Sequence, residues 1–148
     1  MDVGLAHFLT DYGMQPAELG RKVEECGFES LMLPEHTHIP VSRDTPYPGG
    51  GELPPEYSHT LDPFPALAAI AAVTERIKIG TGVCLIIQRD PLVTAKEVAT
   101  VDQISGGRFL FGVGNGWNQD EMENHGTDFR ARHKIARERV LQGPPRLE

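Results

Sequence analysis

The chain has 148 residues, which favours one domain with room for a buried core, and its 39% hydrophobic and 24% charged residues are typical of globular proteins. A formal net charge of -7 without a basic stripe argues against nucleic acid as a partner. Two distant cysteines, Cys26 and Cys84, argue against a disulfide framework, and the lack of a long apolar run or a signal-peptide pattern predicts a cytoplasmic protein that does not contact membranes.

Strand-like and helix-like segments alternate in the first part of the chain. Short apolar runs at residues 3–8 and 30–33 predict buried strands, and Pro34 stops the second. Between them, residues 16–26 carry apolar side chains at helical spacing and begin with a proline, which suits a first helical turn. Residues 37–60 are polar and rich in proline and glycine, so they predict a long loop or lid.

The same alternation continues in the second half of the chain. Asp62 and Asp90 are each followed by a proline, and each pair predicts a helix that starts with the aspartate as its N-cap. Strands are predicted at residues 77–87 and 108–113, each after one of these helices.

Two further helices are predicted beyond the last strand. Asn118 and Glu121 have the N-x-x-E spacing of a capping box, and residues 129–140 form an amphipathic helical pattern. The order of strand and helix is therefore repeated four times along the sequence. This order predicts an α/β fold with a parallel sheet and helices outside it.

Three glycines at every second position, Gly112, Gly114 and Gly116, lie at the end of the last strand. A dinucleotide-binding loop needs its third glycine where this chain has Trp117, and such a loop normally follows the first strand of its unit. A bare backbone at the carboxyl end of a parallel strand also suits close contact with a different ligand. A tight turn without any ligand is an equal alternative on these residues alone.

Polar residues and glycines gather at the same end of all four predicted strands. The first strand ends at His7 and Phe8, and the second ends in the sequence EHTH at residues 35–38. The third contains GTGV at residues 80–83, where glycines within a strand mark a bulge or a close approach by a ligand or backbone. This distribution is typical of the active site of a barrel.

His36 and His38 also permit a metal site, because side chains at alternate positions of a strand point the same way. The later strand ends offer only Cys84 and Asn115 as further ligands, which is a poor set for a hydrolytic metal. We therefore expect no metal, and we expect His38 in a surface loop. From the sequence alone, His36 is either a site residue or the beginning of the lid.

Four segments in order carry a family resemblance that covers residues 3–141: EECGFESLMLPEH, DPFPALAAIAAVTERIKIGTGV, RDPLVTAKEVATVDQISGGRFLFGVGNGW and the helix at residues 130–140. With these segments the chain resembles the luciferase-like monooxygenases, and in particular the branch that uses the deazaflavin coenzyme F420. The resemblance implies a TIM-type (β/α)8 barrel, which normally needs about 250 residues. Residues 1–141 would supply about the first four βα units, and residues 142–148 form a tail unlike the family.

The resemblance also implies where the coenzyme and the substrate lie. Glu35 and His36 match an acidic-histidine pair beside the coenzyme ring and are the expected catalytic residues. The expected contacts to the ring, besides His36, are Thr81, Gly82, Val83, Gly114, Asn115 and Gly116. The expected contacts to the substrate are His7, Phe8 and Trp117. Related enzymes have a cis peptide at the position between Gly82 and Val83. Asn115 stands where some relatives have a glutamate, and an amide does not donate a proton readily.

The activity that the resemblance implies is hydride transfer between coenzyme F420 and a small organic substrate. Two alternatives stay open, namely an FMN-dependent monooxygenase of the same fold and a catalytically inactive half-barrel that persists as an oligomer. Four strands leave open sheet edges and an uncovered inner face. We therefore expect a homodimer or a larger assembly of this chain.

Overall fold

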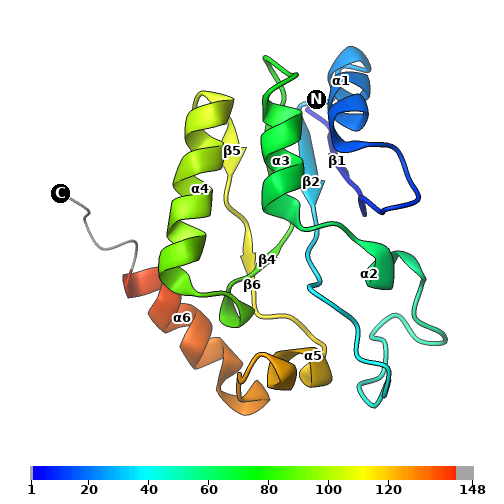
Figure 1. Cartoon of the computed structure of the whole chain (residues 1–148), viewed down its shortest axis with the longest axis vertical. Helices are drawn as coiled ribbons and strands as arrows, with labels where there is room; N and C mark the ends of the chain where they lie inside the picture. The colour runs from blue at the N-terminus through cyan, green and yellow to red at the C-terminus, as the bar shows by residue number, and fades with distance from the viewer. Residues whose placement is uncertain (1, 143–148) are drawn as a thin grey trace.

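A parallel sheet of four strands forms the centre of the protein (Figure 1). The computed structural model describes residues 2–142. The sheet contains β1 (Gly4–Ala6), β2 (Ser30–Leu33), β3 (Lys78–Thr81) and β5 (Phe109–Leu110), paired in that order. Neighbours in the sheet thus follow the order of the chain, as in a singly wound barrel and unlike the crossed order of a dinucleotide-binding sheet. This topology agrees with the predicted first half of a (β/α)8 barrel.

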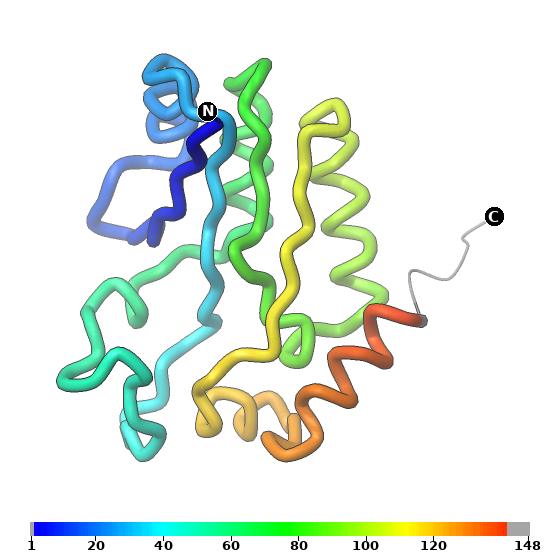
Figure 2. The backbone as a smooth tube through the Cα atoms, turned by 180° about the vertical axis from the view of Figure 1, so that it is seen from behind, coloured from blue at the N-terminus to red at the C-terminus, as the bar shows by residue number. Residues whose placement is uncertain are grey.

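Three helices cover one face of this sheet. They are α1 (Pro16–Glu25), α3 (Pro63–Ala71) and α4 (Pro91–Ser105). Seen from behind, the strands lie in front of these helices, and no helix within residues 2–142 covers the strands on that side (Figure 2). One face of the sheet is therefore packed, and the other, which would line the inside of a barrel, is open.

The predicted helix starts are confirmed by their caps. Asp62 Oδ1 accepts a hydrogen bond of 2.9 Å from the backbone N–H of Phe64 at the start of α3. Asp90 Oδ1 accepts bonds of 2.9 Å from the N–H groups of Leu92 and Val93 at the start of α4. Each aspartate satisfies donors that have no partner within the helix itself.

The hydrophobic core lies between the helices and the sheet. Leu31 and Ile79 of the sheet and Leu67 of α3 have no exposed surface. Burial of a side chain of this size contributes about 1.5–3 kcal/mol relative to leaving it in water. Leu110 follows Phe109, which packs against the core, so it points to the opposite face of the sheet, where it is 43% exposed.

The third and fourth strands are each interrupted, which differs from the continuous strands predicted at residues 77–87 and 108–113. Beyond β3 the chain continues as β4 (Cys84–Leu85) and the 3-10 helix η1 (Ile86–Gln88), and beyond β5 it continues as β6 (Val113–Gly114). β4 and β6 form a separate parallel pair. The peptide bond between Gly82 and Val83, which separates β3 from β4, is cis, as the family resemblance implies.

The predicted lid contains one short helix, α2 (Glu56–His59). Beyond β6 follow α5 (Gln119–Asn124), the 3-10 helix η2 (Phe129–Ala131) and α6 (Arg132–Gln142), so the last predicted helix begins three residues later than expected and is preceded by a separate turn. The tail predicted at residues 142–148 lies, apart from Gln142, outside the described residues. Within residues 2–142 no helix has the length and apolar character needed to cross a membrane.

Candidate active site

His36 lies beyond the carboxyl end of β2, among aromatic side chains from other strand ends and from α2. Only 6% of its side chain is exposed. Its ring centroid is 5.3 Å from that of Tyr57 and 5.8 Å from that of Trp117, and Phe8 lies 4.6 Å from Tyr57. Burial and a hydrogen bond with Tyr47 raise the pKa of Tyr57 to about 12, so its phenol is neutral at physiological pH. These rings, tilted against one another, form an aromatic wall beside the imidazole.

Glu121 fixes the orientation of the His36 ring. Its Oε2 lies 2.7 Å from His36 Nδ1, and its Oε1 accepts a hydrogen bond of 3.0 Å from the backbone N–H of Thr37. Because a carboxylate accepts hydrogen bonds, Nδ1 is the nitrogen that carries a proton in the neutral ring, and Nε2 is left as an acceptor. His36 can therefore take up a proton at Nε2 while Glu121 holds its Nδ1–H group.

Glu121 was not among the predicted site residues, because the sequence assigned it to the capping box of α5. The cap is half present: Asn118 Oδ1 accepts from the Glu121 N–H at 3.2 Å, but the Glu121 carboxylate turns to His36. One signal was available in the sequence. A carboxylate in the first turn of a helix that follows the fourth strand lies at the same sheet edge as the end of the second strand.

The carboxylate of Glu35 is hydrogen-bonded to groups other than His36. Its Oε2 accepts a hydrogen bond of 2.7 Å from the Leu85 N–H, and its Oε1 accepts one from Arg89. Arg89 also pairs with Asp62 and Glu97, so that its guanidinium joins three carboxylates. Glu35 therefore does not orient the His36 ring, because its two oxygens are bonded to Leu85 N–H and to Arg89.

The glycines of the predicted site allow close approach between neighbouring strands. A Cβ on Gly112 would lie 2.2 Å from the backbone oxygen of Thr81, and one on Gly114 would lie 2.3 Å from Val83 Cγ2. Gly116 has a φ of 65°, so it supports the tight-turn interpretation. Glycines at 112 and 114 are thus required by strand packing, whatever else binds there.

Thr81 and Val83 take different positions on the two sides of the cis peptide. Thr81 is fully buried and donates a hydrogen bond of 2.7 Å to the Gly112 carbonyl. Gly82 packs against Met32, because a Cβ there would lie 3.0 Å from Met32 Cβ. Gly82 and Val83 are exposed, Val83 by 39%, so these two members of the group can contact a ligand directly.

The remaining predicted residues divide into two groups. Phe8 and Trp117 belong to the aromatic wall around His36, and His7 and Phe8 line an open hollow of about 580 Å³ beside β1. Asn115 is directed to α6, where its Nδ2 lies 2.6 Å from His133 Nδ1. The structure therefore brings Phe8 and Trp117 to the aromatic wall, leaves His7 in the hollow beside it, and gives Asn115 a partner elsewhere.

His36 and His38 do not share a partner, in contrast to the geometry that a common metal would need. His38 is exposed, its ring centroid is 5.5 Å from that of His125, and its Nε2 lies 3.0 Å from Asn124 Nδ2. Within residues 2–142 no three His, Cys, Asp or Glu side chains are grouped to hold a metal ion.

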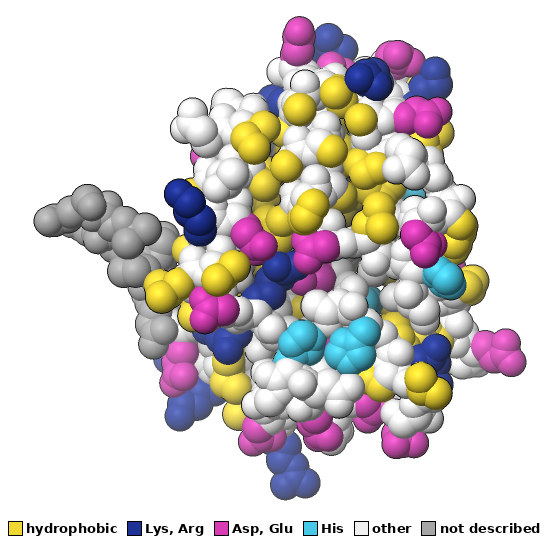
Figure 3. Space-filling model, viewed as in Figure 1, with side chains coloured by type: hydrophobic (Ala, Val, Ile, Leu, Met, Phe, Trp, Pro, Cys, Tyr) yellow, Lys and Arg dark blue, Asp and Glu magenta, His cyan; other side chains and the backbone are white. Residues whose placement is uncertain are grey.

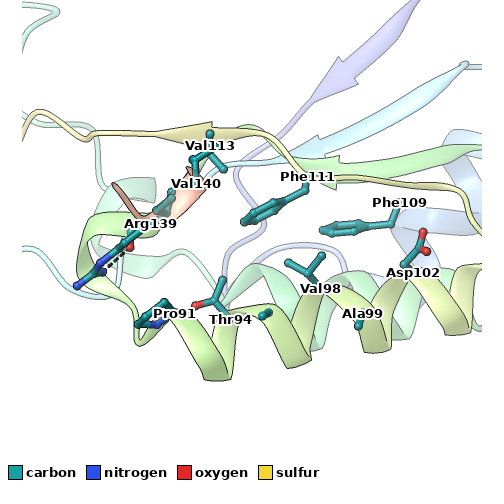
Figure 4. Close-up of a pocket in the computed structure, with 12 residues that line it drawn as sticks. Pro91, Thr94, Val98, Ala99, Asp102, Phe109, Phe111, Val113, Arg139 and Val140 are labelled. Atoms are coloured by element: carbon teal, nitrogen blue, oxygen red, sulfur yellow. Dashed lines mark hydrogen bonds between the residues drawn. The ribbon is translucent and has the colours of Figure 1, made fainter. Parts of the chain in front are cut away.

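A second hollow lies at the other edge of the sheet, between α4 and the segment from β5 to β6. It has a volume of about 460 Å³, and Phe109 and Phe111 point into it toward Val98 of α4 (Figure 4). Arg139 and Val140 of α6 close one end. This apolar groove shares no lining residue with the surroundings of His36, so it belongs to the open edge and not to the candidate active site.

Comparisons with known proteins agree with this geometry. Residues 14–141 match the family model of the luciferase-like monooxygenases. An uncharacterised protein of Mycobacterium tuberculosis is 45% identical over 141 residues, which are 93% of this chain and 50% of that protein. The alkanal monooxygenase alpha chain of Photorhabdus luminescens is 31% identical over 75% of this chain and 26% of that one. The chain thus spans half or less of the length of these relatives.

Solved structures show the same fold. The oxygenating constituent of 3,6-diketocamphane monooxygenase from Pseudomonas putida, in complex with FMN, superposes with a TM-score of 0.75 at 19% identity, over 96% of this chain and 38% of that one. The coenzyme F420 dependent tetrahydromethanopterin reductase of Methanopyrus kandleri superposes with a TM-score of 0.59 at 26% identity, over 86% of this chain and 30% of that one. The chain belongs to the luciferase-like monooxygenase family.

Proposed function

We propose that this chain provides the ring-binding part of an oxidoreductase that transfers hydride between coenzyme F420 and a small organic substrate. The observation that carries the proposal is the buried imidazole of His36, held by Glu121 at the carboxyl ends of the parallel strands. In a barrel fold this end of the strands is where reactants bind. The similarity to the F420-dependent reductase supports the choice of coenzyme.

The residues around His36 fit a flat, largely apolar ring. Trp117, Tyr57 and Phe8 offer aromatic rings, and Val83 presents an exposed apolar side chain beside the cis peptide that follows β3. The bound deazaflavin would supply the hydride chemistry, and the protein would supply placement and electrostatics. His36 Nε2 would donate or accept a hydrogen bond at the polar edge of the ring, while the aromatic wall excludes water.

Two other functions have support from particular observations. The FMN complex of the camphane monooxygenase favours FMN as the alternative coenzyme. The open sheet face and the exposed Leu110 favour a catalytically inactive half-barrel that is stable only as an oligomer. For either active form, we propose self-association of the chain, and we propose a cytoplasmic location, where the free thiols of Cys26 and Cys84 persist.

A coenzyme titration distinguishes these functions, because Trp117 is the only tryptophan of the chain and lies beside His36. The fluorescence of Trp117 is followed while oxidised F420, reduced F420 or FMN is added. The proposal predicts saturable quenching by F420 at lower concentration than by FMN. Tighter binding of FMN would assign the monooxygenase alternative, and the absence of quenching by either would favour the inactive half-barrel.

A further inference from the structure

The hydroxyl of Thr37 connects the buried Glu121 to two exposed histidines. Thr37 Oγ lies 3.3 Å from Glu121 Oε1, 2.6 Å from His125 Nε2 and 3.0 Å from His38 Nδ1. His36 and Glu121 have only 6% and 1% of their side chains exposed, whereas Thr37 and His125 are both exposed. A continuous series of hydrogen-bonding groups therefore runs from the buried imidazole to the surface.

The contacts around Thr37 determine where its hydroxyl proton points. Asn124 Nδ2 donates to His38 Nε2 at 3.0 Å, so the proton of neutral His38 lies on Nδ1 and is donated to Thr37 Oγ. The single hydroxyl proton can be donated to Glu121 Oε1 or to His125 Nε2, and the shorter contact, 2.6 Å against 3.3 Å, favours His125. Partial burial of the ring and the neighbouring His38 lower the pKa of His125, which keeps this nitrogen free to accept at neutral pH.

We propose that Glu121, Thr37 and His125 form a proton path between His36 and solvent. In the outward direction, protonated His36 gives its Nδ1 proton to Glu121 Oε2. The carboxyl group rotates about its Cγ–Cδ bond and donates the proton from the side of Oε1 to Thr37 Oγ. The Thr37 hydroxyl passes its own proton to His125 Nε2. His36 loses one proton and is left neutral with its remaining proton on Nε2, His125 gains one proton, and Glu121 and Thr37 regain their starting protonation.

The proposed function requires that His36 exchange protons with water, and the use of this path in catalysis rests on that function. A general acid or base in a site closed by aromatic rings must exchange its proton with water between turnovers. The other charged group of this helix turn is engaged elsewhere, because Asp120 Oδ2 accepts from the Thr45 N–H at 3.1 Å and from Ser42 Oγ at 3.3 Å. Glu121, Thr37 and His125 are thus positioning residues that act through His36.

The path is tested without any coenzyme, by the exchange rate of the His36 Nδ1 proton with water in the 148-residue chain labelled with nitrogen-15 histidine. Thr37→Val removes the hydroxyl and keeps the shape of the side chain, so we expect exchange at least about tenfold slower, given that positioned proton-transfer groups contribute about 100-fold or more. Thr37→Ser keeps the hydroxyl, and its rate should stay within about twofold of the wild-type rate.

Substitutions at the two surface histidines identify the group through which the proton leaves. This test is independent of whether the threonine variants fold. His125→Gln should slow the exchange at least about fivefold, whereas His38→Gln should leave it within about twofold, because His38 only donates to the hydroxyl. Wild-type exchange rates in both Thr37→Val and His125→Gln would overturn the path. Slowing by His38→Gln alone would overturn the assignment of His125 as the exit. Failure of F420 to bind would contradict the proposed function. It would not change the exchange rates of the His36 proton, which test the path separately.

Discussion

Glu121 holds the imidazole of His36 from the first turn of α5. Its carboxylate is almost fully buried but accepts bonds from His36 Nδ1 and the Thr37 N–H. A buried carboxylate is tolerated when it is hydrogen-bonded, and the N-terminal end of a helix favours negative charge. Because this carboxylate cannot also complete the capping box, the N-x-x-E spacing predicted the helix but not the use of Glu121.

Glu24 shows how one side chain can hold a turn, and it gives a pH-dependent prediction. It accepts hydrogen bonds from the backbone N–H groups of residues 75–77, at distances from 2.6 to 3.2 Å. Burial raises the pKa of Glu24, but the bonds from these three N–H groups outweigh it and hold the pKa below its ordinary value. Stabilisation is therefore complete above the ordinary carboxyl pKa and is lost as the pH falls through the lower, folded-state pKa.

We predict that Glu24→Gln lowers the free energy of unfolding by about 1 kcal/mol at pH 7, after allowance for the partial exposure of the group, and by less in acid. Urea denaturation at several pH values measures this difference. Glu25→Gln is the matched control, because among the described residues Glu25 pairs only with exposed Lys22, at 3.0 Å, and it should change stability by less than about 0.5 kcal/mol. Equal effects of the two variants at every pH would contradict the account.

Arg89 connects the elements that surround the site. Its guanidinium pairs with Glu35 beyond β2, with Asp62 at the start of α3 and with Glu97 of α4. Only 12% of the Arg89 side chain and 1% of the Glu35 side chain are exposed, so loss of one partner leaves a buried charge. This cluster fixes the end of β2, and with it the start of the segment that carries His36.

We predict that Arg89→Met destabilises the chain by about 3 kcal/mol or more, the usual cost when one partner of a buried pair is removed. Adding Glu35→Gln to this variant removes the unpaired charge and should restore part of the loss, which chemical denaturation of the single and double variants can measure. An Arg89→Met variant as stable as the wild type would show that the cluster does not hold these elements.

The elements differ in how well the sequence predicts them. Asp62 and Asp90 are local N-cap signals, and the helix starts that they predict are both correct. The break after Thr81 depends on contact with Gly112 of the next strand, which is 31 residues away. In the site, the position of His36 follows from the strand that precedes it, but the direction of Glu35 toward Arg89 depends on three separate elements. Local signals could not supply these tertiary contacts.

At the scale of the whole molecule, two surfaces lack a cover within residues 2–142. One is the open face of the sheet with the adjoining groove lined by Phe109 and Phe111. The other is the helical face, where hydrophobic side chains gather over α3 and α4 (Figure 3), and where Leu92 and Val93 are 61% and 58% exposed. Apolar surface of this kind favours association.

We predict that the isolated chain forms at least a dimer, through the open sheet or through α3 and α4. Light scattering coupled to gel filtration measures the mass directly, and the monomer mass is 16.3 kDa. Leu92→Glu and Leu110→Glu separate the two surfaces, because only the substitution in the true interface should weaken the assembly. A stable monomer at micromolar concentration would contradict the prediction.

Binding of coenzyme F420 to a chain that lacks the His36 imidazole tests the central claim most directly. Trp117 fluorescence is titrated with F420 in the wild type, in His36→Ala and in His59→Ala, a control at an exposed histidine paired with Asp11. We predict at least tenfold weaker binding in His36→Ala, about 1.5–3 kcal/mol for one charge-assisted contact, and little change in the control. Thermal melts of His36→Ala and the wild type should be similar. Unchanged affinity in His36→Ala with an unchanged melt would contradict the claim and would indicate that His36 is part of the lid and does not bind the coenzyme.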